Sequence, residues 1–203
     1  METLVFDLDG TLIEIGGRDY RVYADILSEK GFIPLKFSEY WPLRRARTNI
    51  RNILSLSDCD SDLFFSFFLA ERQKRIEQED YLSLDRPFPE TTNVLYQLRR
   101  LYACRLVTAR HNIPATERQL KRLDLYDLFS SVHIVQKSKR ETFNQIESVR
   151  FIIGDTENDI VPAQACGIPV IGITTGIRDK KTLSSFSPDY VIDRLSEIYT
   201  LIP

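Results

Sequence analysis

Four aspartates at the ends of two apolar segments are the residues of this sequence best suited to chemistry. Asp7 and Asp9 form one pair, Asp155 and Asp159 form the other, and each pair follows a short apolar run. Residues two apart in an extended chain lie on the same side. Carboxylates held that close repel one another, unless one has a raised pKa or a divalent cation binds between them. Because Mg2+ prefers oxygen ligands, the two pairs predict a Mg2+ site if the two segments lie side by side.

Residues that can bind an anion accompany these acids. Gly10 permits a tight turn whose backbone N–H groups can face an anion. Thr108 ends another apolar run and can donate its hydroxyl to a phosphoryl oxygen, and Arg110 follows closely enough to face the same site. Lys139, at the start of a helical pattern, can place an ammonium group against both the anion and the acids, with Lys137 as the alternative.

Short apolar runs bounded by turn residues predict the strands that position these side chains. Six such runs are found, at residues 4–6, 104–107, 132–135, 151–153, 168–173 and 190–192. Helical patterns alternate with them, at residues 91–101, 114–123 and 138–146. Continuous apolar runs are typical of parallel strands, and the alternation is typical of an α/β fold. We therefore predict a Rossmann-like, doubly wound parallel sheet that binds ligands beyond the carboxyl ends of its strands.

The segment between the first strand and residue 91 lacks this alternation and predicts an inserted helical subdomain. We expect helices at residues 20–30, 38–56 and 60–81. Gly31 is the expected left-handed cap of the first helix, and Ser38 is the expected N-cap of the second. The expected hinges are Gly16 and Gly17 on one side and Pro87 and Pro89 on the other. The predicted division is an α/β core of residues 1–15 and 86–203 and a helical cap domain of residues 16–85.

The two longer helices expected in this insert each carry a face with a predicted role. Arg44, Arg47 and Arg51 fall on one flank of the helix at 38–56, at about 100° per residue. These guanidinium groups could bind a carboxylate or a second phosphate of a substrate, and the alternative is a solvated basic edge. On the helix at 60–81 the residues expected to be buried are Leu63, Phe64, Phe67 and Phe68.

The order of the acidic, hydroxyl and basic residues resembles the motifs of phosphatases of the haloacid dehalogenase superfamily. The matching positions are residues 7–11 (DLDGT), Thr108, Lys139 and residues 154–159 (GDTEND). Residues 163–169 and 175–176 further resemble phosphoglycolate phosphatase-like members, although Cys166 stands where alanine is more usual. The helical insert resembles the cap of that family. The resemblance covers nearly the whole chain.

The resemblance implies a role for each acid. Asp7 would be the nucleophile that forms an aspartyl-phosphate. Asp9 would protonate the leaving oxygen and then deprotonate the attacking water. Mg2+ would be held by Asp7, the backbone carbonyl of Asp9 and Asp155, with Asp159 supporting the site from close by.

The expected function is therefore a Mg2+-dependent phosphatase that hydrolyses a small phosphorylated metabolite, with Thr108 and Lys139 holding the phosphoryl oxygens. The first alternative is a phosphotransferase or phosphomutase, in which a hydroxyl group captures the aspartyl-phosphate. The second is a regulatory binding protein without turnover, although none of the motifs is broken. Asp9 argues against dehalogenation, because dehalogenating members of the superfamily lack an acid there.

Composition limits the classes of partner. The 203 residues include 27 basic and 29 acidic side chains, a balance that does not favour nucleic acid or an anionic membrane. No apolar stretch approaches the roughly 20 residues that span a bilayer. Cys59, Cys104 and Cys166 lack metal-type spacing, which fits reduced thiols. We expect a cytoplasmic protein, either a monomer or a homodimer, whose partner is a small phosphorylated molecule.

Overall fold

The computed structural model describes residues 1–136 and 138–202, so Lys137 lies outside the described residues. Within them the chain forms a six-stranded parallel sheet in the order β5-β4-β1-β6-β7-β8. The strands are β1 (Thr3–Phe6), β4 (Ala103–Ala109), β5 (Ser131–Val135), β6 (Val149–Gly154), β7 (Val170–Ile173) and β8 (Tyr190–Ile192). The chain winds outward from β1 to β5, then crosses to β6 and winds outward on the other side. The predicted doubly wound sheet is confirmed.

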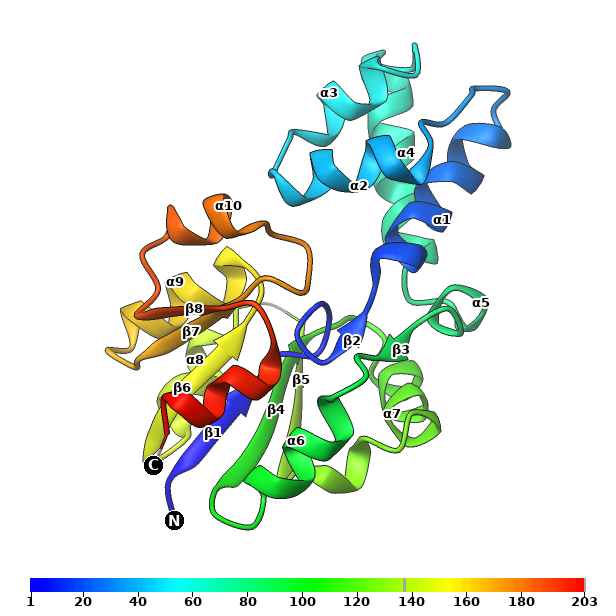
Figure 1. Cartoon of the computed structure of the whole chain (residues 1–203). Coiled ribbons are helices and arrows are strands. Elements are labelled where there is room, and N and C mark those ends of the chain that lie inside the picture. The colour runs from blue at the N-terminus through cyan, green and yellow to red at the C-terminus, as the bar shows by residue number, and fades with distance from the viewer. Residues whose placement is uncertain (137, 203) are drawn as a thin grey trace.

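Helices cover both faces of this sheet (Figure 1). They are α6 (Thr91–Leu98), α7 (Ile113–Arg122), η1 (Tyr126–Leu128), α8 (Arg140–Gln145), α9 (Glu157–Ala165), α10 (Lys180–Ser184) and η2 (Leu195–Thr200). Successive side chains of each strand pack on opposite faces of the sheet, because strand side chains point to the two sides in turn. In β1, Leu4 and Phe6 pack into the core under α6 and η2, whereas Val5 packs with Phe143 of α8 and Ile160 of α9.

A separate group of helices stands beyond the carboxyl ends of the central strands (Figure 1). It comprises α1 (Gly16–Ser28), α2 (Phe37–Arg45), α3 (Ile50–Ser55), α4 (Asp62–Arg75) and α5 (Glu79–Leu82). These helices have a core of their own, formed by Val22, Tyr23, Ile26, Leu27, Tyr40, Ile53, Leu54, Cys59 and Phe68. Two short antiparallel strands, β2 (Ile13–Glu14) and β3 (Arg86–Pro87), connect the group to the sheet.

The single helix predicted at residues 38–56 is wrong, because the chain breaks between α2 and α3. Arg47 adopts a φ of 59°, a left-handed conformation that interrupts helical hydrogen bonding. Asn49 then starts α3 by accepting a hydrogen bond from the Arg51 N–H. The predicted cap at Ser38 is also wrong, since α2 begins at Phe37 after Lys36. Gly31 does have a positive φ, of 79°, as predicted.

The single helix predicted at residues 60–81 is wrong as well. It ends at Arg75, and a new turn, α5, begins after Gln78, whose ψ of 149° is extended. Of the apolar residues expected to be buried here, Phe68 is fully buried, whereas Leu63 is 85% exposed. Leu63 lies in the first turn of α4.

No helix in the described parts of the chain combines the length and the apolar character that crossing a bilayer requires.

Candidate active site

The register of the central strands brings the predicted acids to one edge of the sheet. Phe6, the last residue of β1, is level with Leu106 of β4 and with Ile153 of β6. Asp7 follows β1 directly, and Asp155 follows β6 directly, one position further along than Asp7 in this register. Parallel strands end on the same side, so acids from distant segments share the crevice that such folds use for ligands.

Asp7, Asp155 and Asp159 form a buried cluster in which one carboxylate oxygen of each lies within 4.8 Å of the others. Lys139 precedes α8 and lies against this cluster. Its Nζ donates to Asp7 Oδ1 and to Asp159 Oδ1, each at 2.5 Å. Thr156 is the N-cap of α9, and it fixes Asp159 by donating its N–H and its hydroxyl to Oδ2.

Burial is the largest single influence on the pKa of each of these groups. It raises the pKa of Asp7 to about 7, although the adjacent Lys139 acts to lower it. Burial also raises the pKa of Asp155 well above its usual range, and the charges of Asp7 and Asp159 add to the effect. For Lys139 burial acts to lower the pKa, but Asp159 and Asp7 outweigh it, so the pKa is raised and the amine is a cation.

The donor set of this cluster fits a hard divalent cation. Asp155 Oδ2 accepts the Ile177 N–H at 2.7 Å, but Asp155 Oδ1 is buried and has no hydrogen-bond partner among the described residues. An unpaired buried carboxylate oxygen costs free energy unless a cation or a donor satisfies it. Asp7, Asp155 and Asp159 could therefore hold a metal ion through oxygen ligands, the type that Mg2+ prefers.

Gly10 serves the cluster through its small size. Its φ is 79°, and a Cβ at this position would overlap the Asp155 carboxylate and Gly176. Its N–H donates to the Ile13 carbonyl oxygen at 2.9 Å. The Gly10 N–H therefore closes the turn after β1, and anion binding by the other backbone N–H groups of this turn stays a prediction. The residue is needed there because a side chain would displace Asp155.

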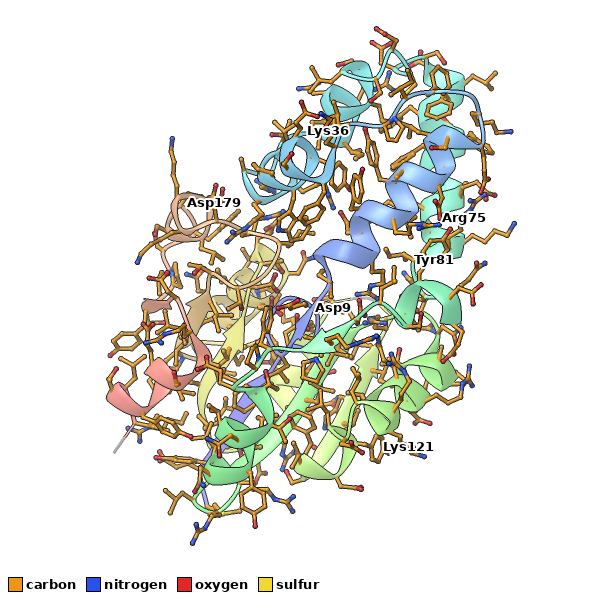
Figure 2. All side chains as sticks on the ribbon, turned by 45° about the vertical axis from the view of Figure 1, so that its right-hand side comes forward. Asp9, Lys36, Arg75, Tyr81, Lys121 and Asp179 are labelled. Atoms are coloured by element: carbon orange, nitrogen blue, oxygen red, sulfur yellow. The ribbon has the colours of Figure 1, made fainter. Side chains whose placement is uncertain are left out.

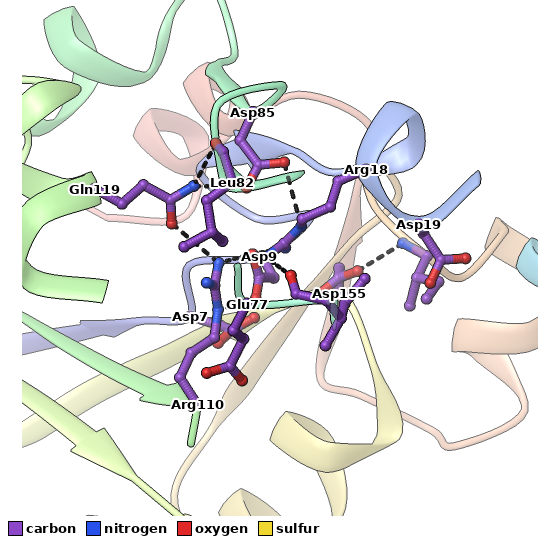
Figure 3. Close-up of polar contacts among 12 residues, drawn as sticks. Asp7, Asp9, Arg18, Asp19, Glu77, Leu82, Asp85, Arg110, Gln119 and Asp155 are labelled. Atoms are coloured by element: carbon purple, nitrogen blue, oxygen red, sulfur yellow. Dashed lines mark hydrogen bonds and ion pairs between the residues drawn. The ribbon is translucent and has the colours of Figure 1, made fainter. Parts of the chain in front are cut away.

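Asp9 lies apart from this cluster, at the junction between the sheet and the helical group (Figure 2). Arg110 binds both of its carboxylate oxygens at 2.6 Å, and Arg18 of α1 binds Oδ1 at 2.5 Å (Figure 3). Burial acts to raise the pKa of Asp9, but Arg110 and Arg18 outweigh it and hold the pKa well below its usual range. Asp9 is thus an anion between two cations.

A second row of polar residues supports the two arginines. Asp85 Oδ1 lies 3.3 Å from Arg18 Nε, and Gln119 of α7 accepts from Arg110 and donates to Asp85 Oδ2 at 2.7 Å (Figure 3). Burial raises the pKa of Asp85 to about 6, although Arg18 acts to lower it. This network joins α1, the start of β3 and α7.

Two cavities adjoin the acids and share Ala109. One has a volume of about 400 Å³ and is lined by Lys139 together with Ser138, Glu157 and Asn158. The other has a volume of about 510 Å³, lies between the sheet and the helical group, and includes Asp9. Thr108, near the end of β4, is buried beside Ala109.

The structure separates the three arginines predicted to share one flank. Arg44 binds Asp19, Arg47 binds Glu157 of the sheet domain, and Arg51 binds Asp62. The helix on which they were expected to align is broken at Arg47, so the prediction of a common flank is wrong.

Three residues at this site were not predicted from the sequence: Arg18 and Asp85, which belong to the network around Asp9, and Arg72, which lines the cavity that includes Asp9. Arg18 and Asp85 reach Asp9 and its partners from opposite ends of the helical group. No local spacing signals such contacts, because they depend on how the group docks on the sheet. Arg18 and Asp85 lie close in sequence to β2 and β3, the two short strands that link the helical group to the sheet. Because the chain passes the crevice at both strands, this proximity is the sequence feature that could have indicated their role.

Comparisons with known proteins agree with the geometry. The family model described as HAD-hydrolase-like matches residues 136–198. Phosphoglycolate phosphatase from Neisseria gonorrhoeae (strain ATCC 700825 / FA 1090) is 30% identical over 226 residues, covering 98% of this chain and 92% of that protein. The Neisseria meningitidis (strain DSM 15465 / Z2491) phosphoglycolate phosphatase is 29% identical over 231 residues, with the same coverage of 98% and 92%. A haloacid dehalogenase-like hydrolase from Streptococcus pneumoniae has a similar fold, with a TM-score of 0.76 at 19% identity, covering 100% of this chain and 99% of that one.

Proposed function

Because this chain belongs to the haloacid dehalogenase superfamily and is a phosphatase of it, we propose a Mg2+-dependent reaction on a small phosphorylated metabolite. The reaction proceeds through an aspartyl-phosphate on Asp7. The helical group, residues 16–85, acts as a cap over the crevice. The names of the curated relatives make phosphoglycolate the first substrate to test.

The observation that carries the proposal is the position of Asp7. It lies at the end of the central strand, buried, with Lys139 on one side and the acids Asp155 and Asp159 close by. The Asp7 carboxylate attacks phosphorus and the bond to the leaving oxygen breaks. Lys139 offsets the charge that develops on the phosphoryl oxygens, and Thr108 donates its hydroxyl to one of them. A Mg2+ ion held by Asp7, the backbone carbonyl of Asp9 and Asp155 would supply further neutralisation of the transferring group.

Asp9 moves the proton in both halves of the reaction. A carboxylate with a low pKa is ionised at neutral pH, which suits Asp9 to take a proton from the water that hydrolyses the intermediate. In the first half Asp9 must carry a proton to the leaving oxygen. We infer that Asp9 leaves Arg18 and Arg110 for that step, because contact with two guanidinium groups disfavours the protonated acid.

The test is phosphate release from a panel of phosphorylated metabolites, with magnesium and with a chelator. We expect magnesium-dependent release by the native chain. Asp7→Asn keeps the shape of the side chain but removes the nucleophile, so we expect activity to fall at least about 10³-fold. Circular dichroism and the melting temperature should show that this variant remains folded. Retention of more than a few per cent of activity by Asp7→Asn would refute the covalent route.

A further inference from the structure

The cavity of about 510 Å³ that holds Asp9 is closed on its other side by one face of α4. The residues that α4 and its C-cap place there are Leu69, Arg72, Gln73 and Ile76, spaced by three and four as one helical face requires. Arg72 is the charged residue of this face. A leaving group whose oxygen receives a proton from Asp9 would extend into this space, toward α4.

Asp19 holds the Arg72 guanidinium in place. Asp19 Oδ1 accepts from Arg72 Nη2 at 2.5 Å, and Oδ2 accepts from the Tyr40 hydroxyl at 2.6 Å and from Arg44 Nε at 3.0 Å. These contacts come from α2 and α4, so Asp19 of α1 ties three helices together at the wall of the cavity. A guanidinium fixed in this way loses little conformational entropy when it binds a ligand.

The charges around Asp19 favour an anion. The Asp19 carboxylate lies between the Arg44 and Arg72 guanidinium groups, so this cluster of three side chains carries one positive charge in excess. Glu77, the other acid on this side of the cavity, accepts the backbone N–H groups of His111 and Asn112. Arg18 and Arg110, the other arginines of the cavity, are almost fully buried and are bound to Asp9. Arg72 is 29% exposed, and its contact with Asp19 engages Nη2 of a group that has five N–H donors. It can therefore bind a second partner without giving up the first.

We propose that Arg72 is a specificity-determining residue that binds a second anionic group, a carboxylate or a further phosphate, on the leaving-group side of the substrate. Asp19 is its positioning residue. The proposal rests on the phosphatase function proposed above and adds the class of substrate. Carboxylate and phosphate share the chemistry that a guanidinium recognises, namely paired oxygens that accept charge-assisted hydrogen bonds.

The experiment compares kcat/KM for three phosphate esters: phosphoglycolate, a hexose bisphosphate, and glycerol phosphate, whose leaving group is neutral. The proteins are the native chain, Arg72→Ala, Arg72→Lys and the control Lys74→Ala. Lys74 lies on the same helix but is 69% exposed and pairs with Glu71. We expect Arg72→Ala to lower kcat/KM for the preferred anionic ester about tenfold or more relative to glycerol phosphate. Arg72→Lys should recover part of the loss, and Lys74→Ala should change nothing.

The choice of esters distinguishes a carboxylate from a second phosphate as the group that Arg72 binds. It also distinguishes failure of the role of Arg72 from failure of the proposed phosphatase function. A selective loss with phosphoglycolate identifies a carboxylate, and one with the bisphosphate identifies a second phosphate. Equal losses with all three esters, or no loss, would overturn the role of Arg72. So would a native enzyme that hydrolyses glycerol phosphate as well as the anionic esters. If the native chain released phosphate from none of them, the proposed function itself would fail.

Discussion

At the residue scale, the acid cluster is organised around a single amine. Asp7, Asp155 and Asp159 share the charge of Lys139, so their full ionisation leaves two negative charges in excess at a buried site. That excess matches the charge of a divalent cation. Without a cation the cluster is expected to keep protons, which is the meaning of the raised pKa values of Asp7 and Asp155.

The first prediction at this scale concerns the metal. Magnesium should raise the melting temperature of the native protein, because a ligand that binds the folded state stabilises it. Replacing Asp155 by Asn removes one charged ligand, so the magnesium-dependent increase should be lost or greatly reduced. Calcium should restore little activity to chelated native protein, since its coordination shell is larger and looser. An undiminished magnesium shift in Asp155→Asn would remove that residue from the site.

The second prediction concerns Asp9. Nitrophenolate leaves readily without a proton, whereas an alkoxide does not, so Asp9→Asn should slow the first step far more for an alkyl phosphate. A proton carrier typically contributes about 10²- to 10⁴-fold. With nitrophenyl phosphate the variant should release a rapid burst of nitrophenol followed by slow turnover, because hydrolysis of the intermediate still lacks its base. Rapid-mixing absorbance would follow the burst. Equal slowing of both esters, with no burst, would contradict the assignment.

At the element scale, the strands were predictable because short apolar runs ending in turn residues have few alternatives to a buried strand. The six predicted strands match β1 and β4 to β8, with boundaries that shift by a few residues. The helices of residues 16–85 were less predictable. Arg47 breaks the second helix although neither Gly nor Pro marks the place, and its side chain pairs with Glu157 across the crevice.

The same distinction holds for the site. Asp7, Asp155 and Asp159 were expected together because strand order and register follow from the pattern of the chain. Arg18 and Arg72 were not expected there, because each belongs to a helix whose docking depends on contacts between distant segments. Asp9 was correctly predicted at the carboxyl edge of the sheet. Its separation from the other acids was not predicted, because it depends on Arg18 and Arg110, which bind it.

A third prediction concerns Asp85, which lies between α5 and β3. Its pKa is about 6 in the folded protein, against an ordinary value of 3.8, so the folded state binds its proton more tightly than the unfolded state does. Stability from this group is therefore present below about pH 4 and is lost as the pH rises toward 6. Relative to the native chain, Asp85→Asn should become more stable over that interval and show no further change above about pH 7. Urea unfolding at several pH values measures the difference, and a change of opposite sign would contradict it.

At the scale of the whole molecule, the helical group contacts the sheet domain on two sides of the crevice. On the side of the connecting strands β2 and β3, the Glu77 carboxylate accepts hydrogen bonds from the backbone N–H groups of His111 and Asn112, just before α7. On the opposite side, the end of α2 meets the loop after β7, where the Asp179 N–H donates to the Arg45 carbonyl oxygen. The helical group therefore contacts the sheet domain on both sides of the crevice that holds the acids (Figures 1 and 2).

The contact that should govern opening on the α2 side is the pair between Arg47 and Glu157, at 3.0 Å, which Arg178 extends. Exposed pairs contribute little to stability, so Arg47→Ala should change the free energy of unfolding by less than about 1 kcal/mol. It should nevertheless favour the open arrangement, because it removes one of the side-chain contacts that join α2 and its C-terminal loop to the sheet domain, beside those that Arg45 and Arg178 make. Spin labels on cysteines replacing the exposed Leu63 and Leu101, with Cys166→Ala, would report longer distances in this variant. Arg51→Ala is the matched control, since Arg51 pairs with Asp62 inside the helical group and should leave the distances unchanged. Unchanged distances in Arg47→Ala, or equal lengthening in both variants, would show that this pair does not hold the two parts together.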